Sequence, residues 1–234
     1  TIRCSWCFDW RSNQRGKTMT FLEAINEVLG RLREDSVSTI TQNSYATMIG
    51  HFVNDAKRQV EDAWDWDAQN TTLNIVTSPG VSTYTIVGSG TKQKSISANN
   101  ITAGSQNTLR AVPMKWIQDQ QQLTNVGTAS PVYYAWNGTD GTDSKVELFN
   151  TPDGVYTIAF NLNVPQVKLV AAGDVIMVPT DAVVMGAYAR ALAERGEDGA
   201  LSSSEAYNLY RGILADRIAI EQSRSEDYAD WVAV

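Results

Sequence analysis

The most regular pattern of apolar and polar positions runs from Ser44 to Trp66 and predicts a long amphipathic helix. Its apolar residues recur at steps of three and four, which places them on one helical face. The opposite face is assigned to solvent because its side chains are amides and charges: Asn54, Asp55, Lys57, Arg58, Glu61 and Asp62. One amphipathic helix cannot bury its own apolar face, so we expect further helices to pack on it.

Three further helices are predicted, one before this stretch and two toward the C-terminus. The first occupies about residues 21–33 and begins at a capping box of Thr20 with Glu23, in which each side chain bonds the other residue's backbone N–H. The third occupies about residues 182–195 and ends at a glycine, with an arginine in its last turn.

The fourth helix begins at a second capping box, formed by Ser202 and Glu205. Four apolar faces need mutual burial, and the region between them offers only strands. We therefore predict a four-helix bundle built from the N- and C-terminal segments. The expected core residues of this bundle are Phe21, Ile25, Leu29, Phe52, Tyr188, Leu192, Tyr210 and Leu214.

The region between the helical ends is predicted to consist of strands and turns. Thr71–Thr77 and Val81–Val87 flank a Pro-Gly turn and are predicted to pair as a hairpin, whereas residues 91–108 are predicted to form a long exposed loop or an irregular pair. Further strands are expected at Thr108–Ile117, Pro131–Trp136, Lys145–Phe149, Val155–Asn163 and Asp174–Val178. About seven short strands at this spacing predict an antiparallel sandwich or barrel-like domain.

The fold class is therefore α+β, with a β domain inserted into a helical bundle. The predicted segments are an N-terminal extension at 1–18, bundle parts at 19–67 and 180–221, the β domain at 68–179, and a C-terminal docking arm at 222–234. Met19 is a candidate natural start, which would make residues 1–18 an upstream extension. The alternative is a true arm that packs Trp6 and Trp10 on a neighbour.

Trp64 and Trp66 are expected at the junction of the long helix and the sheet. Residues two apart do not share a helical face, but they share a strand face, so the transition is placed here. We interpret the pair as an apolar seal between the two layers, with a ligand-stacking site as the alternative.

The formal net charge is −7, and no cluster of Lys and Arg stands out. A protein that holds DNA or RNA through phosphates needs a basic face, so stable nucleic-acid binding is not expected and passing DNA would be repelled. Apolar runs are far shorter than the ~20 residues of a membrane-spanning helix, so no membrane span is expected.

No catalytic constellation is found. Cys4 and Cys7 form a Cys-x-x-Cys pair without further cysteines and with a single histidine, His51, so we interpret them as incidental thiols. Residues 88–92 lack the spacing of a P-loop, and residues 137–143 lack the bidentate glutamate of an EF-hand and are predicted to form a hairpin turn. We therefore predict a protein that is not an enzyme and has neither metal nor cofactor.

Parts of both helical ends resemble the head-to-tail adaptor of tailed bacteriophages, called tail tubular protein A in short-tailed phages. The resemblance begins at Met19, and the β region shares only the architecture. The segments that carry it are residues 19–35, 52–66, 186–198 and 202–222.

This resemblance implies a structural virion protein that assembles in the bacterial host cytoplasm as a homo-oligomeric ring of twelve. The ring would lie in the neck of the virion between the portal and the tail nozzle, with tail fibres as a further candidate partner, and DNA would pass through its channel. The resemblance also implies that the C-terminal segment engages the portal. The candidate docking residues there are Tyr228, Trp231 and Val232.

Two other function classes remain open at this point. The β region could form a carbohydrate-binding or adhesion module in which Tyr133, Tyr134 and Trp136 stack on sugars. A hydrolase whose site has no recognisable motif is the third class. An adaptor oligomerises or binds a ring-shaped partner, whereas a sugar-binding module can act as a monomer.

Overall fold

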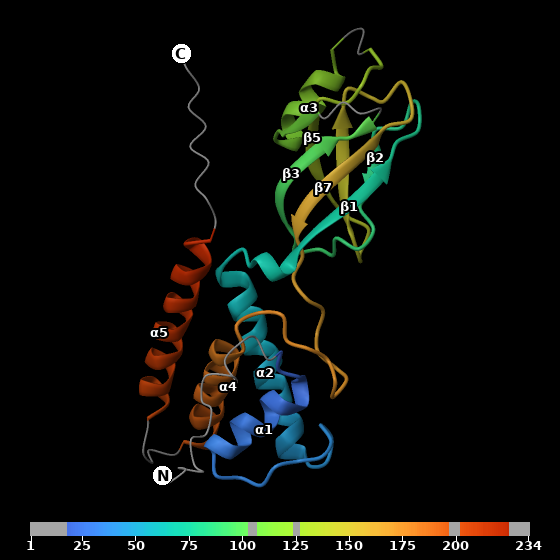
Figure 1. Cartoon of the computed structure of the whole chain (residues 1–234). Coiled ribbons are helices and arrows are strands. Elements are labelled where there is room, and N and C mark those ends of the chain that lie inside the picture. Colours follow the sequence, from blue (N-terminus) through green and yellow to red (C-terminus); the bar gives the residue numbers. More distant parts are fainter. Residues whose placement is uncertain (1–17, 103–106, 124–126, 197–201, 225–234) are drawn as a thin grey trace, which may run out of the picture. The chain divides into compact units, whose positions relative to one another are not determined.

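The computed structural model describes residues 18–102, 107–123, 127–196 and 202–224. These residues fall into two units (Figure 1). The helical unit combines the described residues up to Trp64 with those from Val167 onward, and the β unit comprises Asp65–Gln166. The β unit is therefore inserted in the chain between the two halves of the helical unit.

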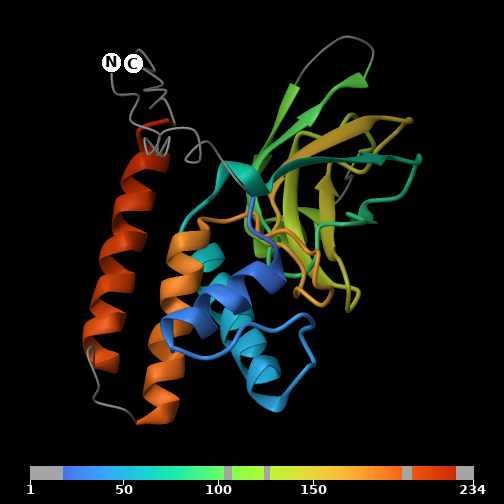
Figure 2. The same cartoon turned by 60° about the horizontal axis from the view of Figure 1, so that its bottom comes forward.

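The helical unit contains four helices, of which α4 contacts the other three. In Figure 2, α4 (orange) lies between α5 (red) and the two N-terminal helices (blue). Small residues dominate the buried part of α4, and this allows neighbouring helices to approach it from several sides. The helices are α1 (Phe21–Arg31), α2 (Ser44–Ala63), α4 (Thr180–Arg195) and α5 (Ser203–Gln222).

Local signals at the helix ends are confirmed. Both capping boxes form, with Thr20 and Glu23 at the start of α1 and with Ser202 and Glu205 at the start of α5. Gly196 ends α4 in the left-handed conformation at φ 63°, which glycine adopts at no steric cost. Helix α2 ends at Ala63, slightly before the predicted end.

The predicted four-helix bundle is not confirmed, because α5 packs mainly on α4. Only Ala206 and Tyr210 of α5 are buried. Among the expected core residues, some are only half-buried, namely Phe52, Tyr188 and Leu214. The others are buried: Phe21, Ile25, Leu29, Leu192 and Tyr210.

Gly186 marks the closest approach of α4 to its neighbours. A Cβ atom at this position would lie 3.2 Å from the Cβ of Ala56 on α2 and 3.1 Å from Cε2 of Tyr210 on α5. Both neighbours are fully buried, so neither has free space to move into. The missing side chain therefore allows α2 and α5 to pack on the same turn of α4.

The β unit is a nearly closed, barrel-like sheet of seven strands in the order β1-β7-β3-β4-β5-β6-β2. Its interior is apolar and aromatic, with Phe160, Leu148 and Ile86 among the fully buried side chains. The strands are β1 (Asn70–Val76), β2 (Thr83–Thr85), β3 (Lys94–Asn100), β4 (Asn107–Ala111), β5 (Tyr133–Thr139), β6 (Ser144–Phe149) and β7 (Thr157–Asn163).

The predicted hairpin between Thr71–Thr77 and Val81–Val87 is wrong. Strand β1 pairs with β7, and β2 pairs with β6, so the two segments lie at the two edges of the sheet order. The Pro-Gly turn is a local signal, and it carries no information about the pairing of Ile75 with Ile158 far along the chain.

At residues 91–108, the observed structure agrees with the irregular pair and not with the loop, since β3 pairs with both β4 and β7 and has a register shift. Two other strand predictions need correction. The strand expected at Thr108–Ile117 ends at Ala111, and Pro113 caps helix α3 (Met114–Gln121) instead. The strand expected at Asp174–Val178 is reduced to one isolated bridge.

The sheet is also not wholly antiparallel, because β4 and β5 pair in parallel. A parallel pair cannot be joined by a tight hairpin and needs a crossover connection. Helix α3 lies in this connection and packs on β5. Its residue Ile117 is fully buried.

The close approach at Gly186 predicts opposite results for two Gly→Ala substitutions. Gly212 lies in the middle of α5, and a Cβ atom added there would meet nothing within 4 Å, so Gly212→Ala should raise the free energy of unfolding by about 1 kcal/mol through helix propensity. Gly186→Ala should lower it, because overpacking of about 1–3 kcal/mol outweighs that gain. Urea unfolding of both variants checks this, and equal stabilisation would contradict the packing described.

Candidate docking surface

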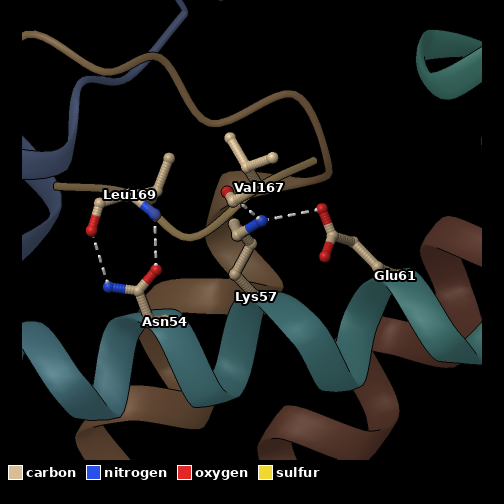
Figure 3. Close-up of polar contacts among 5 residues, drawn as sticks. All are labelled: Asn54, Lys57, Glu61, Val167 and Leu169. Atoms are coloured by element: carbon tan, nitrogen blue, oxygen red, sulfur yellow. Dashed lines mark hydrogen bonds and ion pairs between the residues drawn. The ribbon is translucent and has the colours of Figure 1, made fainter. Parts of the chain in front are cut away.

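Two polar side chains of α2 bind the backbone of the segment that returns from the β unit, and a third pairs with one of them (Figure 3). Asn54 Oδ1 accepts from Leu169 N at 2.8 Å, and Asn54 Nδ2 donates to Leu169 O at 3.2 Å. Lys57 Nζ donates to Val167 O at 3.2 Å and to Glu61 Oε1 at 2.9 Å. We call Asn54, Lys57 and Glu61 the polar stripe.

The polar stripe is buried, so its assignment to the solvent face is wrong. Lys57 and Glu61 are each 2% exposed and Asn54 is 8% exposed. Their spacing of three and four places them on one face of α2, beside the apolar face. Polar residues at this spacing fit a solvent face and a face covered by backbone equally well, and the covering backbone lies more than 100 residues later in the chain.

Burying an ion pair removes both charges from water, so the pair contributes little net stability while either charge alone is strongly unfavourable. Here the Lys57 ammonium donates to a carboxylate and to a backbone carbonyl, and Asn54 bonds both polar groups of Leu169. The stripe therefore fixes the register of the returning backbone along α2.

That register exposes two valines on the outer side of the segment. Val167 is 82% exposed and Val170 is 75% exposed, whereas Leu169 between them is buried. Asp174 accepts from the backbone N–H groups of Val170 and Ala171 at 2.7 and 2.8 Å, and these hydrogen bonds lower the pKa of its carboxyl. The segment is therefore held in a fixed shape that presents apolar side chains outward.

Helix α5 presents a second exposed apolar surface. Tyr207, Leu209 and Ile220 are 43%, 49% and 44% exposed. A pocket of about 450 Å³ opens beside Tyr207. It is lined by Gln59, Ala189, Arg190, Ala193, Ser203, Ser204 and Tyr207, so α2, α4 and α5 all contribute.

The pocket has the character of a docking recess. Arg190 donates to Gly186 O at 2.9 Å and to Gln59 Oε1 at 2.7 Å, so its guanidinium is already engaged in the wall. The remaining lining consists of an amide, hydroxyl and methyl groups and an aromatic ring, and it offers no paired nucleophile and base. Such a pocket is better suited to binding a side chain of another molecule than to catalysing a reaction.

The residues predicted at the helix–sheet junction have different environments. Trp66 is 2% exposed, and its carbonyl accepts from Asn163 Nδ2 at 2.8 Å. Trp64 follows α2 directly and is half-buried. A ligand could not stack on the buried ring of Trp66, which counts against the ligand-stacking alternative. The predicted portal-docking residues Tyr228, Trp231 and Val232 lie outside the described residues.

Two of the three aromatic residues proposed for sugar stacking, Tyr134 and Trp136, pack in the β-unit interior, and Tyr133 lies on the opposite face of β5. Tyr134 is 4% exposed, and its ring meets Phe160 edge-on at a centroid distance of 5.5 Å. Trp136 packs against both of these rings, and Tyr133 packs on Trp116. Rings packed on one another in this way do not form an open platform for a sugar.

The β unit contains a buried carboxylate, that of Glu147. It accepts hydrogen bonds of 2.5 to 3.2 Å from four side chains: Ser82, Thr83, Gln121 and Asn137. Burial raises the pKa of this carboxyl, but the four donors together outweigh burial and lower it. A carboxylate held in its charged form by four donors is a structural acceptor and a poor general base.

The other candidate residues within the described ranges also form no catalytic or metal-binding site. His51 is exposed on α2, and Asp140 caps the β5–β6 turn by accepting from Thr142 N and Asp143 N. No group of three His, Cys, Asp or Glu side chains among the described residues could hold a metal ion. None of the described helices is long and apolar enough to cross a membrane. Cys4 and Cys7 lie outside the described residues.

Comparison with known proteins identifies one family. The family model described as SU10 adaptor protein matches residues 19–232, which include both units. No curated protein matches the chain.

The buried ion pair of Lys57 and Glu61 predicts that a single substitution lowers the free energy of unfolding much more than a double substitution does. Lys57→Met should lower the free energy of unfolding by about 3–5 kcal/mol, because it leaves the Glu61 carboxylate buried without the facing cation. Lys57→Met with Glu61→Leu should restore most of this loss. Arg58→Met, whose ion pair with Asp55 is exposed, serves as the control and should change stability by less than about 1 kcal/mol. A double variant as unstable as Lys57→Met would contradict this account.

Glu147 predicts an acid-sensitive contribution to stability. A lowered carboxyl pKa stabilises the folded state above the ordinary glutamate pKa of about 4.3, and this contribution disappears as pH falls through the lower folded-state value. Thermal unfolding between pH 6 and pH 3 should therefore show Glu147→Gln to be less stable than wild type at pH 6, with a smaller difference at pH 3. The exposed Glu194→Gln is the control, and a difference independent of pH would count against this role.

Proposed function

The chain belongs to the SU10 adaptor protein family of phage structural adaptors, and we propose that it is the head-to-tail adaptor of a tailed bacteriophage. In this role it joins the portal of the head to the tail nozzle as a tail tubular protein A-like connector. The observation that carries the proposal is the family match over residues 19–232, which contains the helical ends where the resemblance to such adaptors lies.

The proposed assembly is a ring of identical copies, twelve in the adaptors that the chain resembles. Two features of the helical unit support a role in assembly. The returning segment presents Val167 and Val170 outward, and α5 has exposed apolar side chains along its length. Exposed apolar surface of this kind commonly marks contact with other proteins.

DNA passes through the channel of the proposed ring without being held. A net charge of −7 supports this, since phosphate binding requires a basic face. An acidic channel repels the DNA backbone and a neutral one does not attract it, so in either case the genome can slide during ejection.

The proposed portal contact is the C-terminal arm, which follows the end of α5 at Gln222. Tyr228 and Trp231 are three residues apart, so they would share a face if the arm becomes helical on docking. Serine, arginine and acidic residues precede them and keep the arm soluble before assembly. Two aromatic anchors in a partner groove are typical of interface hot spots.

A binding experiment with the portal ring of the same phage tests this function. The full chain should co-sediment with the portal ring. Deletion of residues 225–234, which leaves α5 intact, should weaken binding by about 100-fold if two aromatic anchors contribute about 1.4 kcal/mol each. The control is Asp227→Asn, which keeps both anchors and should bind as wild type.

The outcomes separate the adaptor function from the arm. If the full chain does not bind the portal ring, the adaptor proposal is wrong. If the deletion binds as tightly as the full chain while circular dichroism shows intact helices, the arm is idle, and the portal contact must be sought on the helical unit.

A further inference from the structure

Helix α5 carries more apolar surface than its contact with α4 can cover. Of its 20 residues, only Ala206 and Tyr210 are buried. Three more apolar residues, Ile213, Leu214 and Ile218, are half-buried. A helix that is apolar on several sides is normally buried on several sides. Helix α5 is buried on one side only, and its other apolar residues are exposed or half-buried.

The uncovered apolar residues form two stripes on opposite flanks of α5. At ~100° per residue, the positions that face α4 lie between them. The acidic stripe consists of Glu205, Leu209, Ile213, Asp216 and Ile220, at steps of four, four, three and four. The basic stripe consists of Tyr207, Arg211, Leu214 and Ile218, at steps of four, three and four. Steps of three and four are the spacing at which a helix packs along another helix.

Each stripe contains a charge that no other described residue neutralises. Asp216 and Arg211 have no hydrogen bond or ion pair with any other residue that the structure describes, whereas Arg217, on the side facing α4, pairs with Asp181. The two flanks are therefore alike in apolar character and opposite in charge. A surface that is complementary to another surface of the same molecule fits a second copy of the chain.

We propose that α5 forms the contact between neighbouring copies, with the acidic stripe of one copy packed against the basic stripe of the next. This inference rests on the proposed ring. In a closed ring every copy must offer two different, complementary patches, one to each neighbour. Two stripes on opposite flanks of one helix meet this requirement, and Asp216 of one copy then faces Arg211 of the next.

The pocket beside Tyr207 continues the basic stripe toward α2. Its recessed, largely uncharged lining can accept an apolar side chain from the acidic stripe of the neighbouring copy, of which Leu209 and Ile220 are the most exposed. The contact then combines a central apolar seam with one ion pair. This ion pair favours contact between the acidic stripe of one copy and the basic stripe of the next, because two acidic or two basic stripes repel each other.

Charge reversal tests this contact without disturbing the core, since both charged residues are exposed. Asp216→Arg alone and Arg211→Asp alone should each reduce the fraction of ring at a fixed concentration at least about tenfold, as measured by native mass spectrometry and sedimentation velocity. The double variant Asp216→Arg with Arg211→Asp should form rings again. Asn208→Asp changes charge on the outer side of α5, in neither stripe, and is the matched control.

Mixing the two single variants is the most specific form of the test. One variant carries arginine in both stripes and the other carries aspartate in both, so an equimolar mixture should assemble rings in which the two alternate. Rescue by mixing is expected only if the stripes contact each other, and a portal or nozzle contact on α5 would not produce it.

Each result bears on a different claim. If wild type forms rings and both single variants do so equally well, or if neither the double variant nor the mixture assembles, the α5 contact is overturned and the adaptor function stands. If wild type stays monomeric both alone and on the portal ring, the ring and this contact are overturned together.

Discussion

Close packing around α4 is the constraint on which the helical unit depends. Gly186 and the small side chains of α4 allow α2 and α5 to approach the same turn, and α1 covers a further part of the helix. Because three helices share α4, each receives only a limited strip of contact. Helices α1 and α2 also pack on each other, but α5 packs mainly on α4. The described residues therefore leave the flanks of α5 uncovered.

The polar stripe of α2 imposes a second constraint. The two polar groups of Leu169 and the carbonyl of Val167 are bound by side chains of α2, so the returning backbone has one register. Such a buried polar set contributes more to the choice of one arrangement than to net stability. In an adaptor this is useful, because surfaces presented to several partners must keep a fixed geometry when each partner is added.

The features that sequence predicts well here are local. Capping boxes at Thr20 and Ser202 and the glycine after α4 involve residues within one helical turn, and all three lie where their patterns predict them. Strand pairing is predicted poorly because β1 pairs with β7, a partner that no neighbouring turn specifies. The burial of Lys57 escapes prediction for the same reason, since its carbonyl partner belongs to a distant segment. The two stripes of α5 can be found in the sequence, but the structure is needed to show that α4 leaves them uncovered.

The proposed contact requires that α5 gains on assembly the burial that it does not receive from the described residues of its own chain. Hydrogen exchange of the α5 peptides, compared between the free chain and the chain on the portal ring, tests it most directly. The α5 amides should exchange faster than those of α2 in the free chain and become strongly protected on assembly. Protection of α5 that already equals that of α2 in the free chain, or that does not change on assembly, would contradict it.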